Sequence, residues 1–478
     1  MNLFKSYNKM PTPIRASIWF VVSSILQKGI AFLTMPVFAR LMTKGQFGQY
    51  TIYNSWLEIF TIFATLNLFY GVYNNALTKY PDDRDVVTSS FQALCTTITL
   101  GLFFVYCALH VYINRITGMT TLMTLLLFVQ VLFIPAFRFW AVKQRYEYKF
   151  KKLVILSLLV SLLTPLLGIP AVLLFEEKGY AKIITGAIAQ IVVAVVLYIV
   201  IFKRGKTFYN KSYWKFALAF NLPLIPHYLS STVLNQSDRL MINEICGVEK
   251  AGIYGLAYTI GAIAIIMNEA VMNSYTPYTY QKMKVGAFSD IRKNTRYLVV
   301  LVAIISIALV TLGPEIILII GGDQYKEGMW IIAPIAASIF FRFLYGLYGN
   351  IEFYYEENYF IMIASVITAI LNIVTNYIFI NMYGYLAAGY TTLGCFAIYA
   401  LAHCIFSSYI FKKHTGQKTP YDNSFILFTS ITVIILCIAI MAIYNFPYLR
   451  YGIVLLFAIS LIIMRKKIVE IVKLLRQK

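Results

Sequence analysis

The sequence predicts an all-α polytopic membrane protein with about 14 transmembrane helices. Of its 478 residues, 60% are hydrophobic and 13% are charged, and the mean hydropathy is +0.72. Soluble domains carry charge on about a quarter of their residues. Apolar segments long enough to cross about 30 Å of hydrocarbon recur along the whole chain. Basic residues concentrate in every second connection between these segments, as in membrane proteins with several spans.

Each predicted span is a mostly apolar run of roughly 17 to 28 residues, close to the length that a membrane-crossing helix needs. In chain order the spans are 14–41, 50–69, 87–113, 119–142, 153–175, 183–202, 217–242, 253–275, 297–320, 329–348, 359–379, 387–411, 425–444 and 448–464. The last is short and contains Arg450. A chain of twelve spans with one re-entrant hairpin is therefore the alternative.

The distribution of lysine and arginine predicts that both termini are cytoplasmic. With the amino terminus inside, and with basic residues at the ends of spans counted in the adjoining loops, 29 of the 41 basic residues fall in cytoplasmic stretches, eight in outer loops and four deeper within spans. Cytoplasmic loops of membrane proteins carry this excess. The net charge of +21 is thus explained by orientation and by contact with anionic lipid headgroups, with no need for nucleic acid as a partner.

The stretch 221–254 is long enough to span the membrane but carries polar residues that hydrocarbon does not solvate. His227, Ser231, Asn235 and Asp238 follow the spacing i, i+4, i+8 and i+11, which places them on one helix face. Such a polar stripe lines a wet cavity or another helix, because lipid offers no hydrogen-bond partners.

Two sequence echoes predict a duplicated half. Gly48-Gln49-Tyr50 matches Gly252-Ile253-Tyr254 at an offset of 204 residues, and Gly179-Tyr180-Ala181 matches Gly384-Tyr385-Leu386-Ala387 at an offset of 205. We therefore predict three parts: residues 1–206 with six spans, residues 207–411 with six spans, and an appended pair in residues 412–478.

Charged side chains inside the spans are candidate functional groups, because each costs about 2.5–3.5 kcal/mol to insert at the bilayer centre. Lys28 lies in the middle of the first predicted span, and Glu58 lies near the middle of the second. Two interpretations remain open. The pair either locks its two helices together, or both groups face a cavity in which Lys28 attracts an anionic substrate and Glu58 tunes that charge or accepts a proton.

The other candidates fall into two groups. The predicted cavity or substrate residues are Lys28, Glu58, Gln27, Asn54, His227, Asn235, Arg342 and Asn372. The candidates for gating or ion coupling are Asp238, Arg239, Glu269 and Arg138. Several have a structural alternative: His227 can be a hydrogen-bonded core histidine, Arg342 a contact to headgroups, Arg138 an interfacial anchor, and Asp238-Arg239 an ordering pair at a helix end.

Several function classes are disfavoured. The six cysteines and four histidines show no paired metal-ligand spacing, so we expect no disulfide framework, metal or cofactor. The first 15 residues are basic, but the following apolar run is too long for a cleavable signal peptide. Every predicted loop is too short for a nucleotide-binding or catalytic domain. We therefore expect a protein that is not an enzyme, and a polysaccharide polymerase or ligase is disfavoured because it needs a large outer loop.

Several short motifs in order resemble the polysaccharide-export branch of the multidrug/oligosaccharidyl-lipid/polysaccharide (MOP) flippase superfamily. They are Arg40-Leu41-Met42-Thr43 before Phe47-Gly48-Gln49-Tyr50, Pro223-x-x-Pro226 before Asp238-Arg239, Gly313-Pro314-Glu315-Ile316 before Gly321-Gly322, and Asn372-x-x-x-Asn376-Tyr377 before Tyr383-Gly384. Together they cover the first twelve predicted spans.

This resemblance implies two six-helix lobes related by a pseudo-twofold axis, with a central cavity and two appended helices. It also implies a Wzx-type flippase of the bacterial cell membrane. Its cargo would be undecaprenyl-diphosphate-linked repeat units for O-antigen, capsule or a similar polymer, moved outward by alternating access, with coupling to H⁺ or Na⁺ left open. Membrane lipids and the polysaccharide polymerase and chain-length machinery are the implied partners. A lipid II flippase and a drug or metabolite antiporter of the same fold are the alternatives.

Overall fold

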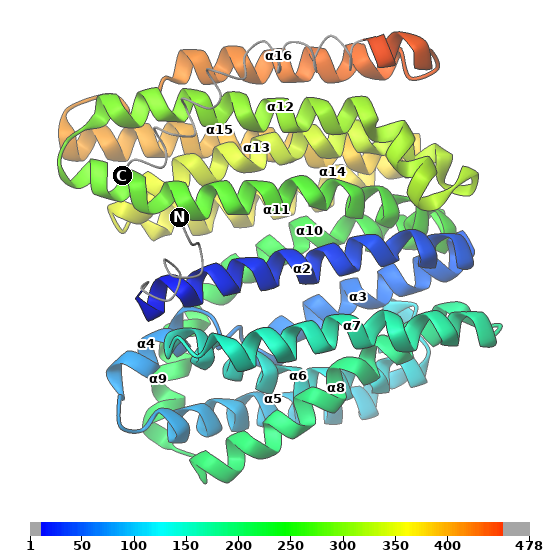
Figure 1. The fold of residues 1–478 in the computed structure, drawn as a ribbon, viewed down its shortest axis with the longest axis vertical. Coiled ribbons are helices and arrows are strands. Elements are labelled where there is room, and N and C mark those ends of the chain that lie inside the picture. The colour runs from blue at the N-terminus through cyan, green and yellow to red at the C-terminus, as the bar shows by residue number, and fades with distance from the viewer. Residues whose placement is uncertain (1–10, 453–478) are drawn as a thin grey trace, which may run out of the picture. The chain divides into compact units, whose positions relative to one another are not determined.

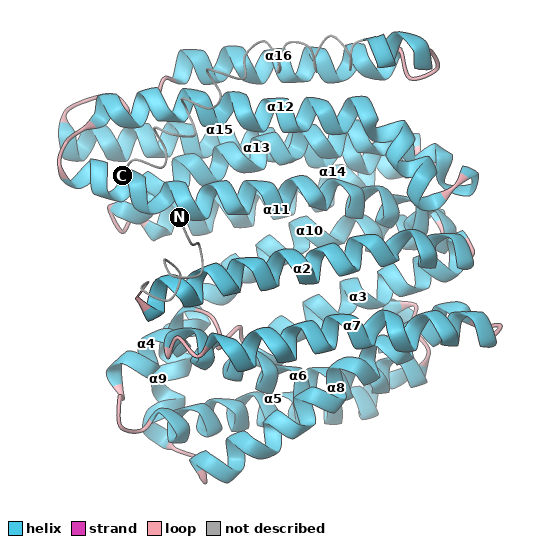
Figure 2. Cartoon of the chain, in the orientation of Figure 1, coloured by secondary structure: helices cyan, strands magenta, loops and turns pink. Residues whose placement is uncertain are grey.

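The computed structural model describes residues 11–452, and these form helices joined by short loops, with no strand in that range (Figure 2). Eleven of the described helices are long and apolar enough to cross a membrane. The predicted all-helical class is therefore confirmed, whereas the count of fourteen is not. Most of the predicted span 448–464 lies outside the described residues.

The chain divides into two compact units, Met1–Gly255 with Ser365–Ile373, and Leu256–Ala364 with Val374–Lys478. The lobe boundaries expected from the sequence duplication stay a prediction. The helices that lie in the first unit are α2 (Thr12–Leu41), α3 (Lys44–Thr65), α4 (Gly71–Lys79), α5 (Arg84–Thr117), α6 (Thr121–Tyr146), α7 (Phe150–Leu174), α8 (Lys178–Gly205), α9 (Lys211–Asn221), the 3₁₀ turn η1 (Leu222–Leu224) and α10 (Ile225–Cys246).

The second unit is built around α13. Its elements are α12 (Phe288–Gly321), the 3₁₀ turn η2 (Asp323–Gly328), α13 (Met329–Tyr354), α15 (Ala387–Thr415) and α16 (Asn423–Ala442), with most of α11 (Val248–Lys284) and the two ends of α14 (Asn358–Tyr383). α13 packs against α12, α15 and α16. It is correspondingly enclosed, since its side chains are buried almost without interruption.

In the first unit α5, α6 and α8 pack against one another, and α7 packs against both α8 and α2 (Figure 1). Their shared core is aromatic. Tyr73, Phe91 and Phe139 are fully buried and their rings meet at centroid distances of 4.9–6.4 Å. Aromatic rings prefer such offset and edge-to-face contacts, so the rings pack in defined orientations.

The sequence fixes where α3 begins and ends. Thr43 and Gln46 form a reciprocal capping box, with the Gln46 N–H donating to Thr43 Oγ1 (3.2 Å) and the Thr43 N–H to Gln46 Oε1 (3.1 Å). This satisfies two of the backbone donors that a helix start leaves free. At the other end Leu66 takes a left-handed conformation. Its carbonyl accepts a hydrogen bond from the buried amide of Asn221.

Pro223 and Pro226 divide the predicted span 217–242. α9 ends at Asn221, a 3₁₀ turn follows over Leu222–Leu224, and α10 begins at Ile225. A proline lacks the N–H that a continuous helix needs and fits best at a first helical turn. The break therefore sets α10 at a direction different from that of α9.

Three glycines allow α11 to pack closely on α3. A Cβ added at Gly48 would overlap the Val248 carbonyl, one at Gly252 would overlap the Lys44 carbonyl, and one at Gly255 would lie against Thr51. Small residues of this kind let transmembrane helices approach to backbone contact. The repeated Gly-x-Tyr motif noted in the sequence thus marks a helix crossing.

We predict that Gly48→Ala lowers the free energy of unfolding by about 1–3 kcal/mol, the usual cost of overpacking a tight site. The new methyl group meets a backbone carbonyl, which cannot rotate away. Thermal unfolding of the purified protein in detergent measures the effect. Gly101→Ala in α5 is the control, because nothing lies within 4 Å of a Cβ there, and a loss of stability equal to that of Gly48→Ala would contradict the prediction.

Candidate functional site

Three separate polar contacts connect α10 with α3 and with the segment Ser365–Ile373 of α14 within the first unit. We call this set the polar seam. Its interhelical contacts are Ser55 Oγ to Gln236 Oε1 at 3.0 Å, Ser237 Oγ to Asn372 Oδ1 at 2.8 Å and His227 Nδ1 to Ser365 Oγ at 3.1 Å. Of the four stripe residues, His227 takes part in these contacts, whereas Ser231 is exposed. The other two α10 partners, Gln236 and Ser237, lie outside the stripe. The environment predicted for the stripe as a whole stays a prediction.

Asp238 is the most enclosed charged residue of the seam. Its side chain is 1% exposed, and it accepts a hydrogen bond from the Tyr254 hydroxyl at 2.5 Å. Tyr254 lies two residues after Gly252, so the close α3–α11 crossing also positions this donor. A carboxylate at membrane depth needs such donors, because burying an unpartnered charge costs several kcal/mol.

Arg239 points to a different part of the seam from its neighbour Asp238. Its Nη1 donates to Gln236 Oε1 at 2.6 Å, and the same oxygen accepts from Ser55. The half-buried guanidinium is thereby held beside α3. The adjacent acid and base, taken from the sequence as a possible ordering pair, thus contact separate partners.

The remaining candidates of the first unit lie on α2, α3, α6 and α10. Lys28 and Gln27 are half-buried on α2, with Gln27 donating to Ser23 Oγ at 3.0 Å. On α3, Asn54 donates to the Tyr50 carbonyl at 2.7 Å, whereas Glu58 is exposed. Both interpretations of Lys28 and Glu58 stay predictions.

Two further candidates, Arg138 and Asn235, make contacts of a different kind. Arg138 places its guanidinium 4.7 Å from the centre of the Phe69 ring, a cation–π distance. Asn235 is half-buried and donates to the carbonyl of Ser231 one turn earlier. Their proposed roles in gating and substrate contact stay predictions.

Glu269 and Arg342 lie in the second unit. Glu269 is exposed on α11 and Arg342 is half-buried on α13. The other ten candidates belong to the first unit. The structure therefore gathers most of the predicted residues within one compact unit.

Lys182 is a buried cation that the sequence placed in an outer loop. α8 begins at Lys178, so Lys182 lies inside the helix, where it is 9% exposed. Its ammonium stands 3.4 Å from the Phe38 ring centre and 4.3 Å from that of Tyr50. No carboxylate within the described range pairs with it. A possible signal in the sequence was the presence of aromatic residues, Phe38 and Tyr50, near the ends of the neighbouring helices.

Two contacts between ionisable side chains in the second unit were also missed. Glu352 and His403 are 0% and 1% exposed, and the His403 Nδ1 lies 2.8 Å from a Glu352 carboxylate oxygen. Arg450, 4% exposed, donates to Glu315 at 2.8 Å. Partners so distant in sequence leave no local spacing pattern. Glu352 also fell in a predicted loop, but α13 extends to Tyr354.

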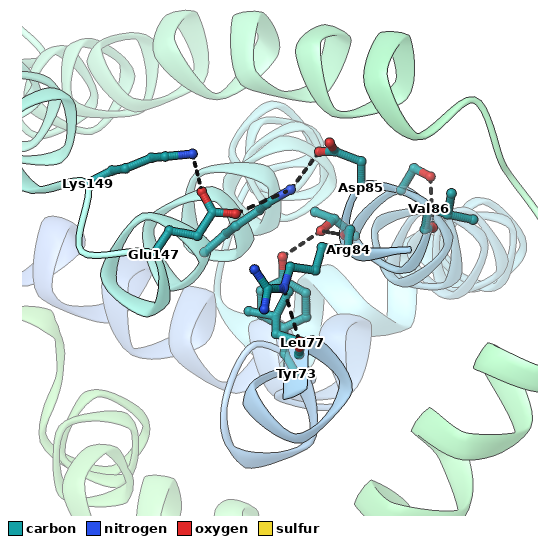
Figure 3. Close-up of polar contacts among 10 residues, drawn as sticks. Tyr73, Leu77, Arg84, Asp85, Val86, Glu147 and Lys149 are labelled. Atoms are coloured by element: carbon teal, nitrogen blue, oxygen red, sulfur yellow. Dashed lines mark hydrogen bonds and ion pairs between the residues drawn. The ribbon is translucent and has the colours of Figure 1, made fainter. Parts of the chain in front are cut away.

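A surface network joins α4, α5 and α6 near their ends (Figure 3). Lys143 donates to Asp85 at 2.6 Å and lies 4.0 Å from Glu147. Arg84 Nε donates to the Leu77 carbonyl at 3.2 Å. Lys143 is only 9% exposed, so this basic residue of a predicted cytoplasmic stretch fixes helix ends as well as orientation.

No group of three or more histidine, cysteine, aspartate or glutamate side chains could hold a metal ion in residues 11–452. The seam offers hydroxyl, amide, carboxylate and guanidinium groups. These bind polar and charged ligands through hydrogen bonds.

The fold is that of known membrane transporters. The lipid II flippase MurJ in an inward closed conformation superposes with a TM-score of 0.65 at 17% identity, covering 94% of this chain and all of that one. A MATE multidrug resistance transporter of the MOP superfamily gives 0.61 at 12% identity, covering 84% and 99%. A MOP transporter from Pyrococcus furiosus gives 0.55 at 14% identity, covering 84% and 96%. The chain is thus a multi-pass membrane protein with the fold of MOP transporters.

The sequence pattern of the family described as "Polysaccharide biosynthesis protein" matches residues 14–283, more than half of the chain, and the chain belongs to this family. Two Haemophilus influenzae proteins are similar. The Lsg locus putative protein 1 is 25% identical over 33% of this chain and 39% of its own length. An uncharacterized membrane protein is 21% identical over 75% and 88%. The resemblance seen in the motifs is thereby confirmed, and family and fold together support a membrane transporter or flippase.

We predict that Tyr254→Phe lowers the free energy of unfolding by about 1.5–3 kcal/mol, the usual contribution of a hydrogen bond to a charged group. It removes a hydrogen-bond donor to the buried Asp238 carboxylate. Thermal unfolding in detergent measures the loss. Tyr377→Phe, at a 64% exposed tyrosine, is the matched control and should leave stability unchanged; equal effects in both variants would show that the Asp238 contact contributes nothing.

Proposed function

We propose that the protein is a flippase that moves undecaprenyl-diphosphate-linked polysaccharide repeat units from the cytoplasmic to the outer leaflet by alternating access. The family match carries the proposal, because it ties the chain to polysaccharide biosynthesis. The fold similarity to MurJ, which is named a lipid II flippase, adds support for a lipid-linked cargo.

The chemistry of the membrane-embedded residues suits such a cargo. A diphosphate needs cationic partners, and Lys28, Arg138 and Arg239 lie within one unit. Sugars need hydroxyl and amide partners, which the polar seam contains. Arginine matches phosphate geometry with paired donors, and lysine meets it as a point charge. A polyprenyl tail can meanwhile stay in lipid.

We place this activity in the bacterial cell membrane with both termini in the cytoplasm, as the lysine and arginine distribution favours. The polymer served would be O-antigen, capsule or a related polysaccharide, made together with a polymerase and a chain-length machinery. The coupling ion would be H⁺ or Na⁺. Asp238 and Glu269 are the acidic candidates for coupling, and one is buried whereas the other is exposed.

We predict that Lys28→Ala abolishes complementation of a bacterium that lacks its repeat-unit flippase, because the variant loses a cation for the diphosphate. Immunoblotting should show normal protein levels in the membrane. Lys28→Arg is the matched variant and should retain much of the polymer, since it retains the charge. Normal polymer with Lys28→Ala would remove this residue from the mechanism.

We predict that the membrane potential accelerates outward movement of the anionic cargo. A charge that crosses the membrane gains about 2.3 kcal/mol per 100 mV, and the negative interior drives the anion outward. Proteoliposomes that carry a fluorescent undecaprenyl-diphosphate oligosaccharide, with a potassium gradient and valinomycin, measure the rate. An equal rate with and without the potential would exclude this contribution while leaving flipping itself established.

A lipid II flippase is the second candidate, and the similarity to MurJ favours it. Complementation distinguishes the two. Rescue of a strain depleted of its lipid II flippase, without restoration of a repeat-unit polymer, would assign the chain to peptidoglycan synthesis instead.

A further inference from the structure

The second unit contains a basic hollow that the proposed transport does not use. It has a volume of about 640 Å³ and lies between the first turns of α12, the last turns of α15 and the start of α16. We call it the basic pocket. Its lining residues are Arg292, Arg296, Ser408, Tyr409, Lys412, Gln417, Lys418, Thr419, Tyr421, Asp422, Asn423 and Ser424.

The pocket has an excess of positive charge. Arg292, Arg296, Lys412 and Lys418 face a single carboxylate, that of Asp422. Asp422 is already engaged, since it accepts hydrogen bonds from Arg296 through both Nε and Nη2. No ion pair joins Lys412 or Lys418 to a carboxylate in the described part of the chain. Three positive charges therefore remain uncompensated.

The walls of the pocket are held in place by hydrogen bonds. Arg292 Nη2 donates to the Thr419 carbonyl at 3.3 Å, and Asp422 Oδ1 caps α16 by accepting from the Phe425 N–H at 3.1 Å. The buried Tyr421 hydroxyl donates to the Leu347 carbonyl at 2.9 Å. Sites that are preorganised in this way lose less entropy when they bind a ligand.

The electrostatic state of Asp422 supports this description. The Arg296 hydrogen bonds, then the Phe425 N–H and the nearby charge of Arg292, hold the pKa of the Asp422 carboxyl below its usual value. The carboxylate consequently stays charged at neutral pH and is occupied by Arg296. An incoming anion would meet Arg292 and the two lysines.

Apolar surface adjoins the basic pocket. Tyr409 lines it and is 61% exposed, and further along the helices Ile405 of α15 is 59% and Phe428 of α16 is 70% exposed. The loop between α15 and α16 belongs to a stretch that the charge distribution places on the cytoplasmic side. A cationic hollow beside lipid-facing helices suits an amphiphile with a negative head and apolar chains.

We propose that the basic pocket binds a phosphate-bearing anionic headgroup, that of a membrane phospholipid such as phosphatidylglycerol. Arg292, Lys412 and Lys418 contact the phosphate, and the acyl chains lie along α15 and α16. This site goes beyond the proposed function, because it is independent of the cargo and stands whichever lipid-linked sugar the protein carries.

The test measures lipid binding by the full-length protein in detergent. Native mass spectrometry follows retention of phosphatidylglycerol, of phosphatidylcholine with the same chains, and of inorganic phosphate. We expect selective retention of phosphatidylglycerol. Binding of inorganic phosphate as tightly as phosphatidylglycerol would support the anion site but assign it to a soluble phosphate, whereas equal retention of both lipids would overturn the proposal.

Two double variants with the same change of charge locate the site. Lys412→Gln/Lys418→Gln removes two cations of the pocket, and we expect about thirtyfold weaker binding of phosphatidylglycerol, since each basic group near anionic lipid contributes about 1 kcal/mol. Lys293→Gln/Lys413→Gln is the control. Lys293 is exposed outside the pocket, and Lys413 pairs with Glu357.

The four lysines are exposed, so both double variants should unfold at the temperature of the wild type in the absence of added lipid. Selective loss of phosphatidylglycerol binding in the pocket variant alone supports the site. Equal weakening in both variants would reduce the interaction to general surface charge and overturn the proposal. A failure of transport assays would not affect this result, because binding is measured without flipping.

Discussion

Hydrocarbon offers no hydrogen-bond partner, and this constraint determines how the first unit is built. Each polar group on a helix at membrane depth must be met by protein or by water. α10 is rich in such groups, and it meets them by packing its polar face on α3 and on the Ser365–Ile373 segment of α14. The glycines at the α3–α11 crossing also help to satisfy a polar group, because the close packing places the Tyr254 hydroxyl within hydrogen-bond distance of Asp238. The polar helix α10 is thus joined to its neighbours by hydrogen bonds rather than by apolar contacts alone.

The sequence predicted the features that depend on local pattern. Length and hydropathy located most of the helices. Two residues of the i, i+4, i+8, i+11 stripe on α10, His227 and Asp238, have hydrogen-bond partners on other helices. The ends of helices were less predictable. Charged residues such as Lys182 and Glu352 were assigned to loops, although they lie within α8 and α13 and are buried. The Glu352–His403 pair joins residues 51 positions apart. This contact forms only because α13 packs against α15. The spacing of residues along the sequence does not reveal such packing. The roles of the candidate site residues stay predictions, because position alone does not reveal what a side chain binds.

Buried ionisable groups are stabilised in two ways. Some have a neighbour of the complementary type: Glu352 lies against His403, Arg450 against Glu315, and Lys143 against Asp85. The Lys182 side chain instead lies against the rings of Phe38 and Tyr50. A cation–π contact offsets only part of the cost of removing a cation from water, so a lysine held in this way is less well stabilised in its charged form than one with a carboxylate partner.

Under the proposed function, surface and membrane-embedded cations would act at successive stages on an anionic lipid. The excess of basic residues on the face assigned to the cytoplasm raises the local concentration of anionic headgroups, and this attraction extends over about a Debye length, roughly 8 Å at physiological salt. It cannot select one phosphate-bearing lipid from another, since the field acts on charge alone. Selection requires groups that touch the headgroup in fixed geometry, such as the hydroxyls and amides of the polar seam. Because those donors are already bonded to one another, a sugar must exchange protein contacts for its own. Only a ligand that offers matching hydroxyl groups can do so without leaving buried polar atoms unsatisfied.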